Sequence, residues 1–205
     1  MTPAIRTIPT GDFQENCYFF EYKPEACFVI DPGCDADYLI SELNDAHLDP
    51  CAILLTHAHF DHISAVKSLV ETFDIPVYLH PADRPLYESA LNCFPPSYPH
   101  HERPETKPLE ALKTIDGVEI NILYTPGHTQ GGCCILFPAE KVMFTGDTLF
   151  QMSIGRTDLP GGNHDQLMQS IHGELLNLNP DIAIFPGHGP SSTIGFEKQN
   201  NPYLS

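Results

Sequence analysis

The chain has few basic residues and no pair of cysteines in the C-x-x-C spacing. Its 205 residues include 27 acidic but only 10 basic side chains, which gives a formal net charge of −17. A surface with so little positive charge repels phosphate backbones and anionic lipid headgroups. We therefore expect a small-molecule partner rather than nucleic acid or a membrane surface.

Long hydrophobic runs are absent as well. No apolar run approaches the roughly eighteen residues of a transmembrane helix. Residues 1–13 also lack the basic-then-apolar order of a secretory signal. We expect a cytoplasmic protein in which residues 1–205 form a single domain. The sequence leaves the oligomeric state open.

The seven cysteines are an odd number, which argues against a disulfide framework and for reduced thiols. We expect four of them to be small apolar core residues on strands: Cys27, Cys51, Cys133 and Cys134. The pattern assigns no role to the other three, which are Cys17, Cys34 and Cys93.

Short apolar runs rich in Val, Ile, Phe and Tyr alternate with segments of helical spacing. The runs predict strands over 17–22, 27–30, 52–56, 76–80, 119–125, 133–138, 141–146 and 182–187. The spacing predicts helices over 37–48, 63–73 and 164–178, the last one capped by Asn163 with Gln166. The proline-rich segment 94–108 predicts a lid-like loop. This order indicates two packed sheets with helices outside them.

The most informative motif is H-x-H-x-D-H, which follows the strand predicted over 52–56. It contains His57, His59, Asp61 and His62, and at this composition it would arise by chance in roughly two chains per thousand. His57 and His59 are two apart, so in an extended segment they point the same way and can bind one metal ion. Asp61 and His62 follow after the chain turns, so they can face a second position. Imidazole and carboxylate ligands suit zinc, iron or manganese.

Three more residues of metal-ligand type follow predicted strands. His128, Asp147 and His188 each come after a Gly or a Pro-Gly break, which lets the backbone turn sharply. Singly each could be a cap, but together with the first cluster they predict one metal cleft. Asp31 ends another strand and is either a turn-forming residue or a carboxylate that orients a ligand loop.

This set of residues resembles the pattern of the metallo-β-lactamase superfamily, and the resemblance covers nearly the whole chain. It implies an α/β (α+β) fold, a four-layer αβ/βα sandwich with the site at one edge of the two sheets. It also implies two metal positions and a bridging carboxylate. His57, His59 and His128 would hold one metal, Asp61, His62 and His188 the other, and Asp147 would lie between them.

The stretch "TGDTLFQMSIGRTDLPGG", residues 145–162, resembles the short glyoxalase II-like (hydroxyacylglutathione hydrolase-like) branch of that superfamily. Longer enzymes of this branch carry a C-terminal helical domain that helps to hold glutathione, but this chain ends 17 residues after His188. Those enzymes also usually have a third histidine where this chain has Ala58. The expected metal ligands are unaffected, whereas glutathione recognition is put in question.

The resemblance implies hydrolysis of a small thioester with two divalent transition metals as cofactors, zinc first and iron or manganese as alternatives. A hydroxide shared by the metals would attack the carbonyl carbon, with His59, Asp61 and Asp147 as the catalytic ligands. A thiol with a pKa of about 8.5 leaves as thiolate without a strong acid, which favours a thioester over an amide.

Substrate contacts are expected from Arg156, Asn16 and Phe13, with Tyr18 close to them. For Arg156 the alternative, an arginine that pins its own loop to a nearby carbonyl or carboxylate, carries at least equal weight.

Two other functions stay open. A mononuclear-iron persulfide dioxygenase shares this scaffold and a "GRTD"-like stretch, but it uses only part of the ligand set, whereas every ligand of the second position is present here. A metal-buffering or metal-sensing protein without turnover would use the same residues. A β-lactamase fits less well because no export signal is recognised, and an RNA-processing nuclease because the surface is acidic.

Overall fold

The structure is a computed structural model that describes residues 4–92, 98 and 102–204. It contains a six-stranded sheet in the order β1-β2-β3-β4-β5-β6 and a five-stranded sheet in the order β15-β14-β11-β10-β9. The first sheet consists of β1 (Ala4–Thr10), β2 (Glu15–Lys23), β3 (Ala26–Ile30), β4 (Asp49–Leu54), β5 (Val77–Leu79) and β6 (Thr106–Pro108). The second consists of β9 (Asn121–Tyr124), β10 (Cys133–Phe137), β11 (Val142–Gly146), β14 (Ala183–Pro186) and β15 (Ser192–Thr193).

The remaining elements are helices and two small hairpins. The helices are α1 (Ala36–Asp45), α2 (Phe60–Ile63), α3 (Val66–Phe73), α4 (Arg84–Tyr87), α5 (His164–Ser170) and α6 (Ile194–Asn200). Short 3₁₀ turns cover Pro81–Asp83, Ala90–Asn92 and Leu109–Ala111, and a π turn, Ile171–Leu175, continues α5. The hairpins pair β7 (Thr114–Ile115) with β8 (Val118–Glu119) and β12 (Leu149–Phe150) with β13 (Ser153–Ile154).

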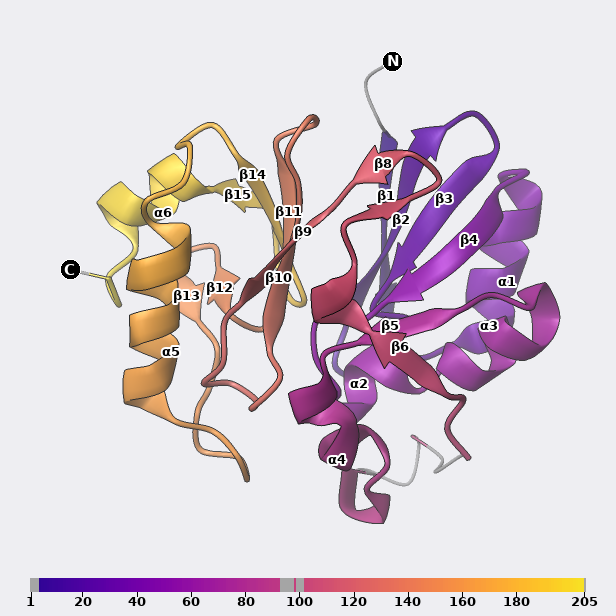
Figure 1. Cartoon of the computed structure of the whole chain (residues 1–205), viewed down its shortest axis with the longest axis horizontal. Helices are drawn as coiled ribbons and strands as arrows, with labels where there is room; N and C mark the ends of the chain where they lie inside the picture. The colour runs from indigo at the N-terminus through magenta and orange to yellow at the C-terminus, as the bar shows by residue number, and fades with distance from the viewer. Residues whose placement is uncertain (1–3, 93–97, 99–101, 205) are drawn as a thin grey trace.

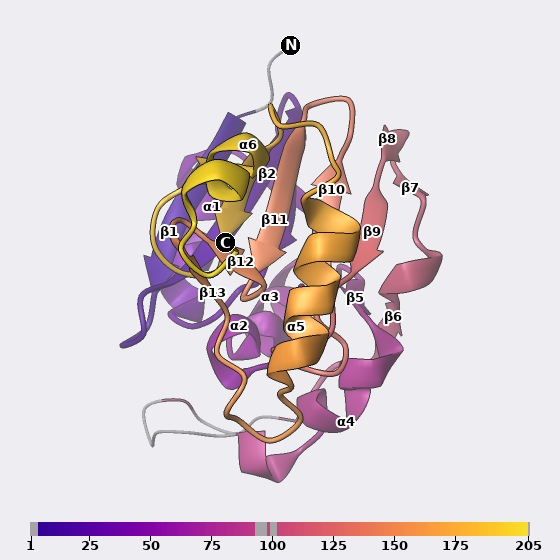
Figure 2. The same cartoon turned by 90° about the vertical axis from the view of Figure 1, so that its left-hand side faces the viewer.

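The two large sheets face each other, and helices cover their outer sides. Figure 1 shows α1 and α3 outside the first sheet and α5 and α6 outside the second. Figure 2, viewed from the side, has α5 and α6 in front of β10 and β11. The order helix, sheet, sheet, helix is the four-layer αβ/βα sandwich that the sequence predicts.

Strand alternation explains how one chain builds three apolar cores. In β2, Tyr18 and Phe20 point into the cluster between the sheets, whereas Cys17 and Phe19 point into the cluster beneath α1 and α3. In the second sheet, β10 divides its residues in the same way between the central cluster and the cluster beneath α5. Successive side chains of a strand point to opposite faces, so each strand needs apolar residues at nearly every position.

The eight predicted strands are all present, but two predictions about other segments need correction. The helix predicted over 63–73 starts only at Val66, because the amides of Ser64 and Ala65 donate to carbonyls of the 32–33 loop instead of continuing α2. The segment 94–108 is not a loop throughout, since Thr106–Pro108 pairs with β5 as an edge strand. Residues 94–97 and 99–101 of that segment lie outside the described residues.

The predicted helix over 164–178 also differs in detail. It is α5 followed by the π turn, and the side chain of Asn163 accepts a hydrogen bond from the Gln166 amide, as expected of a cap. Among the cysteines, the six in the described residues are free thiols. Cys27, Cys133 and Cys134 are buried as predicted, Cys51 is half-buried against the central cluster, and Cys93 lies outside the described residues.

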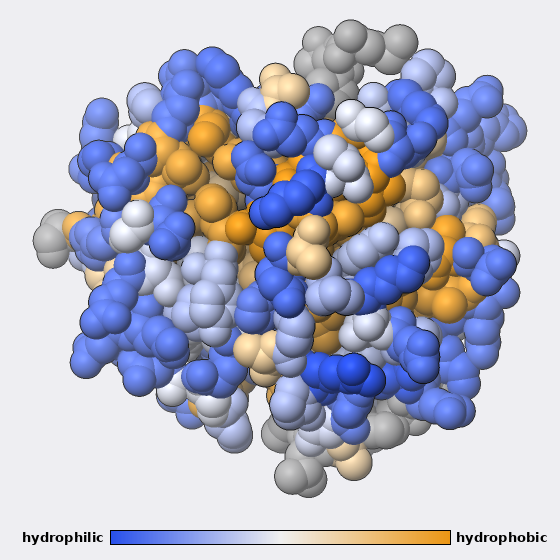
Figure 3. All heavy atoms as spheres, in the orientation of Figure 1, coloured by the Kyte–Doolittle hydropathy of each residue, from blue (hydrophilic) through white to orange (hydrophobic). Residues whose placement is uncertain are grey.

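The surface agrees with the composition. The face in Figure 3 is mainly hydrophilic, with hydrophobic atoms in an interrupted band across its upper half. Within the described part of the chain, no helix has the length and apolar character that a bilayer span requires.

Candidate metal centre

Seven predicted ligand residues come together from both halves of the sandwich. The loop after β4 contributes His57, His59, Asp61 and His62, whereas the loops after β9, β11 and β14 contribute His128, Asp147 and His188. Their arrangement forms two groups, each of which takes ligands from the first half and from the second.

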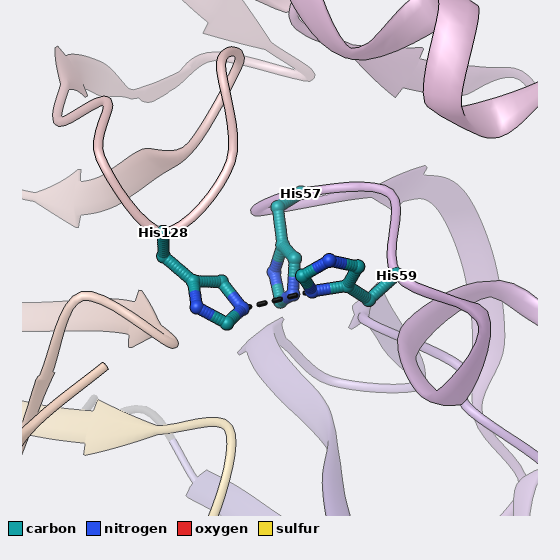
Figure 4. Close-up of side chains that lie close together, drawn as sticks. All are labelled: His57, His59 and His128. Carbon is teal, nitrogen blue, oxygen red and sulfur yellow. Dashed lines mark hydrogen bonds between the residues drawn. The ribbon is translucent and has the colours of Figure 1, made fainter. Parts of the chain in front are cut away.

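The first group consists of three histidines. One nitrogen each of His57, His59 and His128 lies within 4.8 Å of the others, and Figure 4 shows the three rings turned toward one point. His59 Nδ1 and His128 Nε2 are 2.8 Å apart. Three converging imidazole nitrogens are a common protein ligand set for zinc and similar metals.

The second group adds carboxylate. Asp61, His62 and His188 again place one ligand atom each within 4.8 Å of one another. His188 Nε2 lies 3.4 Å from Asp61 Oδ2. Asp147 lies between the groups, because its Oδ1 is 3.4 Å from His62 Nε2 and its Oδ2 is 3.4 Å from His128 Nε2.

The atoms that face the centre lack ordinary partners, which tests whether a metal fits. His57 Nε2 is buried without a hydrogen-bond partner among the described residues. His62 Nε2 and Asp147 Oδ1 are also buried and face each other without hydrogen-bond geometry. An unsatisfied buried polar atom costs roughly 1–3 kcal/mol. Metal ions would remove this cost at each atom, so the donor set fits them.

Asp31 fixes the orientation of one histidine in each group. Its Oδ2 accepts the Thr56 hydroxyl at 2.6 Å and the Nδ1–H of His62 at 3.1 Å. The Thr56 oxygen in turn accepts the Nδ1–H of His57 at 3.1 Å. With Nδ1 protonated, Nε2 of both imidazoles carries the lone pair that a metal needs. Asp31 itself has a left-handed backbone, with φ of 47°.

A third set of residues could in principle hold a metal ion, and the hydrogen bonds of Asp31 explain why it is not a separate site. Asp31, His57 and His62 lie close enough to share an ion, but the Asp31 oxygens are already used by Thr56 and His62. We therefore interpret Asp31 as support for the two groups, which is the carboxylate alternative that the sequence left open. His128 is oriented differently, since its Nδ1–H donates to the carbonyl of Arg156 at 2.7 Å.

The two groups have opposite electrostatics. Burial holds the pKa of His57 well below its usual value and lowers the pKa of His59 to about 3. Burial also disfavours charge on His62 and His188, but nearby carboxylates outweigh it. Asp147 raises the pKa of His62 well above the usual range, and Asp61 raises that of His188. His57 and His59 are therefore neutral imidazoles, whereas His62 and His188 form charged pairs with Asp147 and Asp61.

Glycine is required where the second half approaches the ligands. Gly146, just before Asp147, has φ of 46°, which is left-handed. A side chain at Gly187 would place its Cβ 2.4 Å from Asp147 Oδ1 and 2.6 Å from His62 Cε1. Glycine thus precedes a predicted ligand for two reasons. Gly146 adopts a left-handed turn, and Gly187 lies too close to Asp147 and His62 for a side chain.

Sequence reasoning missed two buried acids near the centre. Asp83 accepts hydrogen bonds from the Ala58 amide at 2.9 Å and from the Thr129 hydroxyl at 2.8 Å, so it ties the two loops of the first group together. It follows β5 as predicted ligands follow their strands, and that position was the available signal. Glu15 is fully buried, and its Oε1 lies 3.7 Å from His62 Nδ1. Nothing in its sequence context distinguishes it from a surface residue.

The expected substrate-contacting residues occupy different surroundings. Phe13 is half exposed and lines the cavity over the metal centre, with its ring edge-on to Phe60. Asn16 is buried, and its amide donates to the carbonyls of Pro186 and Gly189. It therefore holds the His188 loop and offers no amide proton to a substrate.

Arg156 lines the same cavity, but its guanidinium forms a two-pronged pair with Asp158 at 2.7 and 2.8 Å. This corresponds to the loop-pinning alternative of the sequence analysis. Tyr18, also expected nearby, donates its hydroxyl to the carbonyl of Pro186 at 2.6 Å and is buried in the cluster between the sheets.

The cavity over the ligands has a volume of 350 Å³. Apolar side chains line it beside the ligands: Phe13, Phe60, Phe150, Ile154 and Leu159. A concave, largely apolar cavity with converging polar groups is typical of small-molecule sites.

Comparison with known proteins identifies this arrangement. Residues 10–188 match the family described as the metallo-beta-lactamase superfamily. The chain belongs to that superfamily. It is 38% identical to "Hydroxyacylglutathione hydrolase GloC" of Haemophilus influenzae, with 98% of each chain covered. Among solved structures it is similar to BLEG-1, described as a B3 metallo-beta-lactamase, with 41% identity, a TM-score of 0.93 and 98% and 100% coverage.

A second solved structure bears on the metal. TTHA1623, described in a di-iron-bound form, shares 40% identity with this chain, with a TM-score of 0.84 and 97% and 100% coverage. Membership of the metallo-β-lactamase superfamily confirms the predicted family and fold. Together with the histidine and aspartate cluster, it supports a metal-binding hydrolase.

Proposed function

We propose that the protein is a dinuclear, metal-dependent hydrolase of small thioesters, acting as a single domain in the cytoplasm. The observation that carries the proposal is the complete ligand set in two groups with Asp147 between them. The similarity to a protein named as a hydroxyacylglutathione hydrolase supports the substrate class. The free thiols of the six cysteines that the structure describes support a reducing compartment.

His57, His59 and His128 would hold one metal, and Asp61, His62 and His188 would hold the second, with Asp147 shared between them. Bound metals of this kind lower the pKa of water to about 7 and polarise a carbonyl group. Zinc suits the donor set, and the di-iron form of TTHA1623 makes iron the first alternative.

The chain's own residues would position the reactants. Asp61 is only slightly exposed and faces the cavity, so its carboxylate can orient a water molecule toward a bound carbonyl. Phe13, Phe60 and Phe150 line the cavity and exclude bulk water, which strengthens the electrostatic interactions inside it. A thiolate leaving group needs no proton from the protein, which agrees with the absence of tyrosine and lysine among the described residues that line the cavity.

The test pairs metal analysis with a substrate panel. Protein loaded with zinc or iron is assayed against thioester, lactone, β-lactam and phosphodiester substrates, with metal content measured on the same samples. We expect up to two metals per chain and the highest kcat/KM for thioesters. Turnover of no thioester by the two-metal protein would refute the proposal and leave a metal-buffering protein as the alternative.

The same panel addresses two rival enzymes. The similarity to BLEG-1 makes β-lactam hydrolysis the second candidate, and a β-lactam turned over faster than any thioester would establish it. A persulfide dioxygenase would consume oxygen with glutathione persulfide and would need one iron only. Oxygen uptake by the iron-loaded protein separates that reaction from hydrolysis.

A further inference from the structure

A second cavity lies beside the one over the metal centre. Its volume is 380 Å³, and we call it the apolar groove. It is lined by His59, Phe60, Leu86, Ser89, Asn92, Leu159 and Pro160. The proposed reaction assigns it no role.

The apolar groove continues directly from the metal centre. His59, Phe60 and Leu159 line both cavities, and His59 is one of the three histidines of the first group. A molecule whose carbonyl lies at the metal centre can therefore extend an arm past Phe60 and Leu159, which border both cavities.

The groove offers an arm little hydrogen bonding. Leu86 and Leu159 are half-buried, and Pro160 is exposed on the wall of the groove. Asn92 is buried, and its amide nitrogen already donates to the carbonyls of Ala58 and Leu86. An arm that lies here would gain mainly from burial of apolar surface.

The distribution of charge also favours an uncharged arm. Arg156 is the one lysine or arginine among the described residues that line the two cavities, and Asp158 already pairs with it in two-pronged fashion. The whole chain carries a net charge of −17. A thiol carrier with several carboxylates would find no unpaired cation along these described walls and would be repelled by the surface.

We propose that the apolar groove binds an uncharged hydrocarbon arm of the substrate, attached to the reacting carbonyl on either its acyl or its thiol side. This inference rests on the proposed thioester hydrolysis and names its substrate class: thioesters with one aliphatic arm and a neutral partner. Thioesters of carboxylate-bearing carriers such as glutathione are the poorer substrates.

The experiment compares kcat/KM for matched thioesters and metal-loaded protein. One series lengthens the acyl group from acetyl to hexanoyl on neutral N-acetylcysteamine. A second keeps acetyl and lengthens an alkyl thiol, so the two series show on which side the arm binds. Lactoylglutathione represents the charged carrier. Each methylene that enters the groove raises kcat/KM by up to about fourfold, and we expect at least tenfold over one of the two series.

Two variants place the effect in the groove. Leu86→Asp puts a carboxylate on its wall, and Pro160→Trp fills it from an exposed position that the core does not depend on. Both should lower the ratio of long-arm to short-arm kcat/KM by tenfold or more. Leu178→Asp is the matched control, because Leu178 is also a half-buried leucine but packs on the cluster beneath α5. It should leave that ratio unchanged.

The outcomes separate the two proposals. If short thioesters are hydrolysed but neither series gains with length, or if lactoylglutathione is the best substrate, the groove proposal is wrong and the hydrolase stands. If both groove variants keep the wild-type ratio, the arm binds elsewhere and the groove proposal is again wrong. If no thioester is hydrolysed by the two-metal protein, both proposals fail.

Discussion

The two groups of candidate ligands lie side by side but differ in the pKa values of their histidines. In the first group, burial lowers the pKa of His57 well below its usual value and that of His59 to about 3. In the second, Asp147 raises the pKa of His62, and Asp61 raises that of His188, against the effect of burial. His57 and His59 can therefore bind a metal at neutral pH without losing a proton, whereas His62 and His188 must first release protons.

A shared support connects these unlike groups. Asp31 orients His62 directly and orients His57 through the Thr56 hydroxyl. The pKa values of the two groups therefore differ because of the carboxylates beside His62 and His188, since Asp31 supports a histidine in both groups. Substitutions can distinguish the effect of Asp31 on both groups from the effects of residues that act on one group.

The largest effect is expected from Asp147→Ala, because Asp147 contacts both groups. Loss of correctly placed metal removes several kcal/mol of transition-state stabilisation, so kcat/KM should fall about a thousandfold or more. His59→Ala should behave in the same way. His172→Ala replaces an exposed histidine and is the control. Wild-type turnover by metal-stripped Asp147→Ala would contradict the assignment.

The variants Asp31→Asn and Thr56→Val separate the effect of Asp31 on both histidines from the effect of the Thr56 hydroxyl on His57 alone. Asp31→Asn disturbs both His57 and His62, so it should weaken metal binding at both positions, by about 10- to 100-fold. Thr56→Val keeps the shape but removes the hydroxyl that reaches His57, so it should weaken the first position alone. Metal titration with a colorimetric competitor measures both affinities. Equal effects of the two variants on the second position would show that Asp31 does not act on His62.

The pH dependence should differ between the positions. His62 and His188 have raised pKa values in the metal-free protein, so below those values a proton competes with the metal. The second affinity should fall from pH 8 to pH 6, by roughly tenfold per pH unit for each proton displaced. His57 and His59 are already neutral over this range, because their pKa values are lowered. Calorimetric titrations at the two pH values would measure this, and a parallel loss of both affinities would contradict it.

The smallest effect is expected from Glu15→Gln. Burial raises the pKa of Glu15 well above the usual range, which favours its neutral form, and the amide is a near match in shape. Metal affinity at the second position should change by less than about threefold. Glu15→Ala serves as the contrast because it opens a cavity. A loss above tenfold with Gln would mean that a charged carboxylate is needed beside His62.

The features that could be predicted from the sequence are apolar residues that recur along a strand and short motifs of ligand-type residues. Four of the seven predicted ligands stood out through the H-x-H-x-D-H motif and the other three because each follows a strand and a glycine. The central strands stood out because nearly every residue in them is apolar. Edge strands such as β1 and β6 escaped, since Thr, Arg and Pro there reflect pairing with one neighbour and not burial on two faces.

Residues whose role depends on a distant contact were harder to assign. Asn16 was expected to touch substrate, but its amide hydrogen bonds reach residues about 170 positions further along the chain. Asp83 and Glu15 were missed for a similar reason, because their partners lie in other elements and loops of the chain. The break between α2 and α3 follows from bonds to the 32–33 loop, which no helical periodicity contains.

The division of the ligands between the two halves affects how the protein matures. Neither half of the sandwich contains all residues of either candidate group. The half with the first sheet lacks His128 and His188, and the half with the second sheet lacks the 57–62 loop. In the proposed hydrolase, a chain in which only one half has folded would present an incomplete ligand set at both positions. We therefore expect metal capture and hydrolysis to begin only after the two halves have packed together.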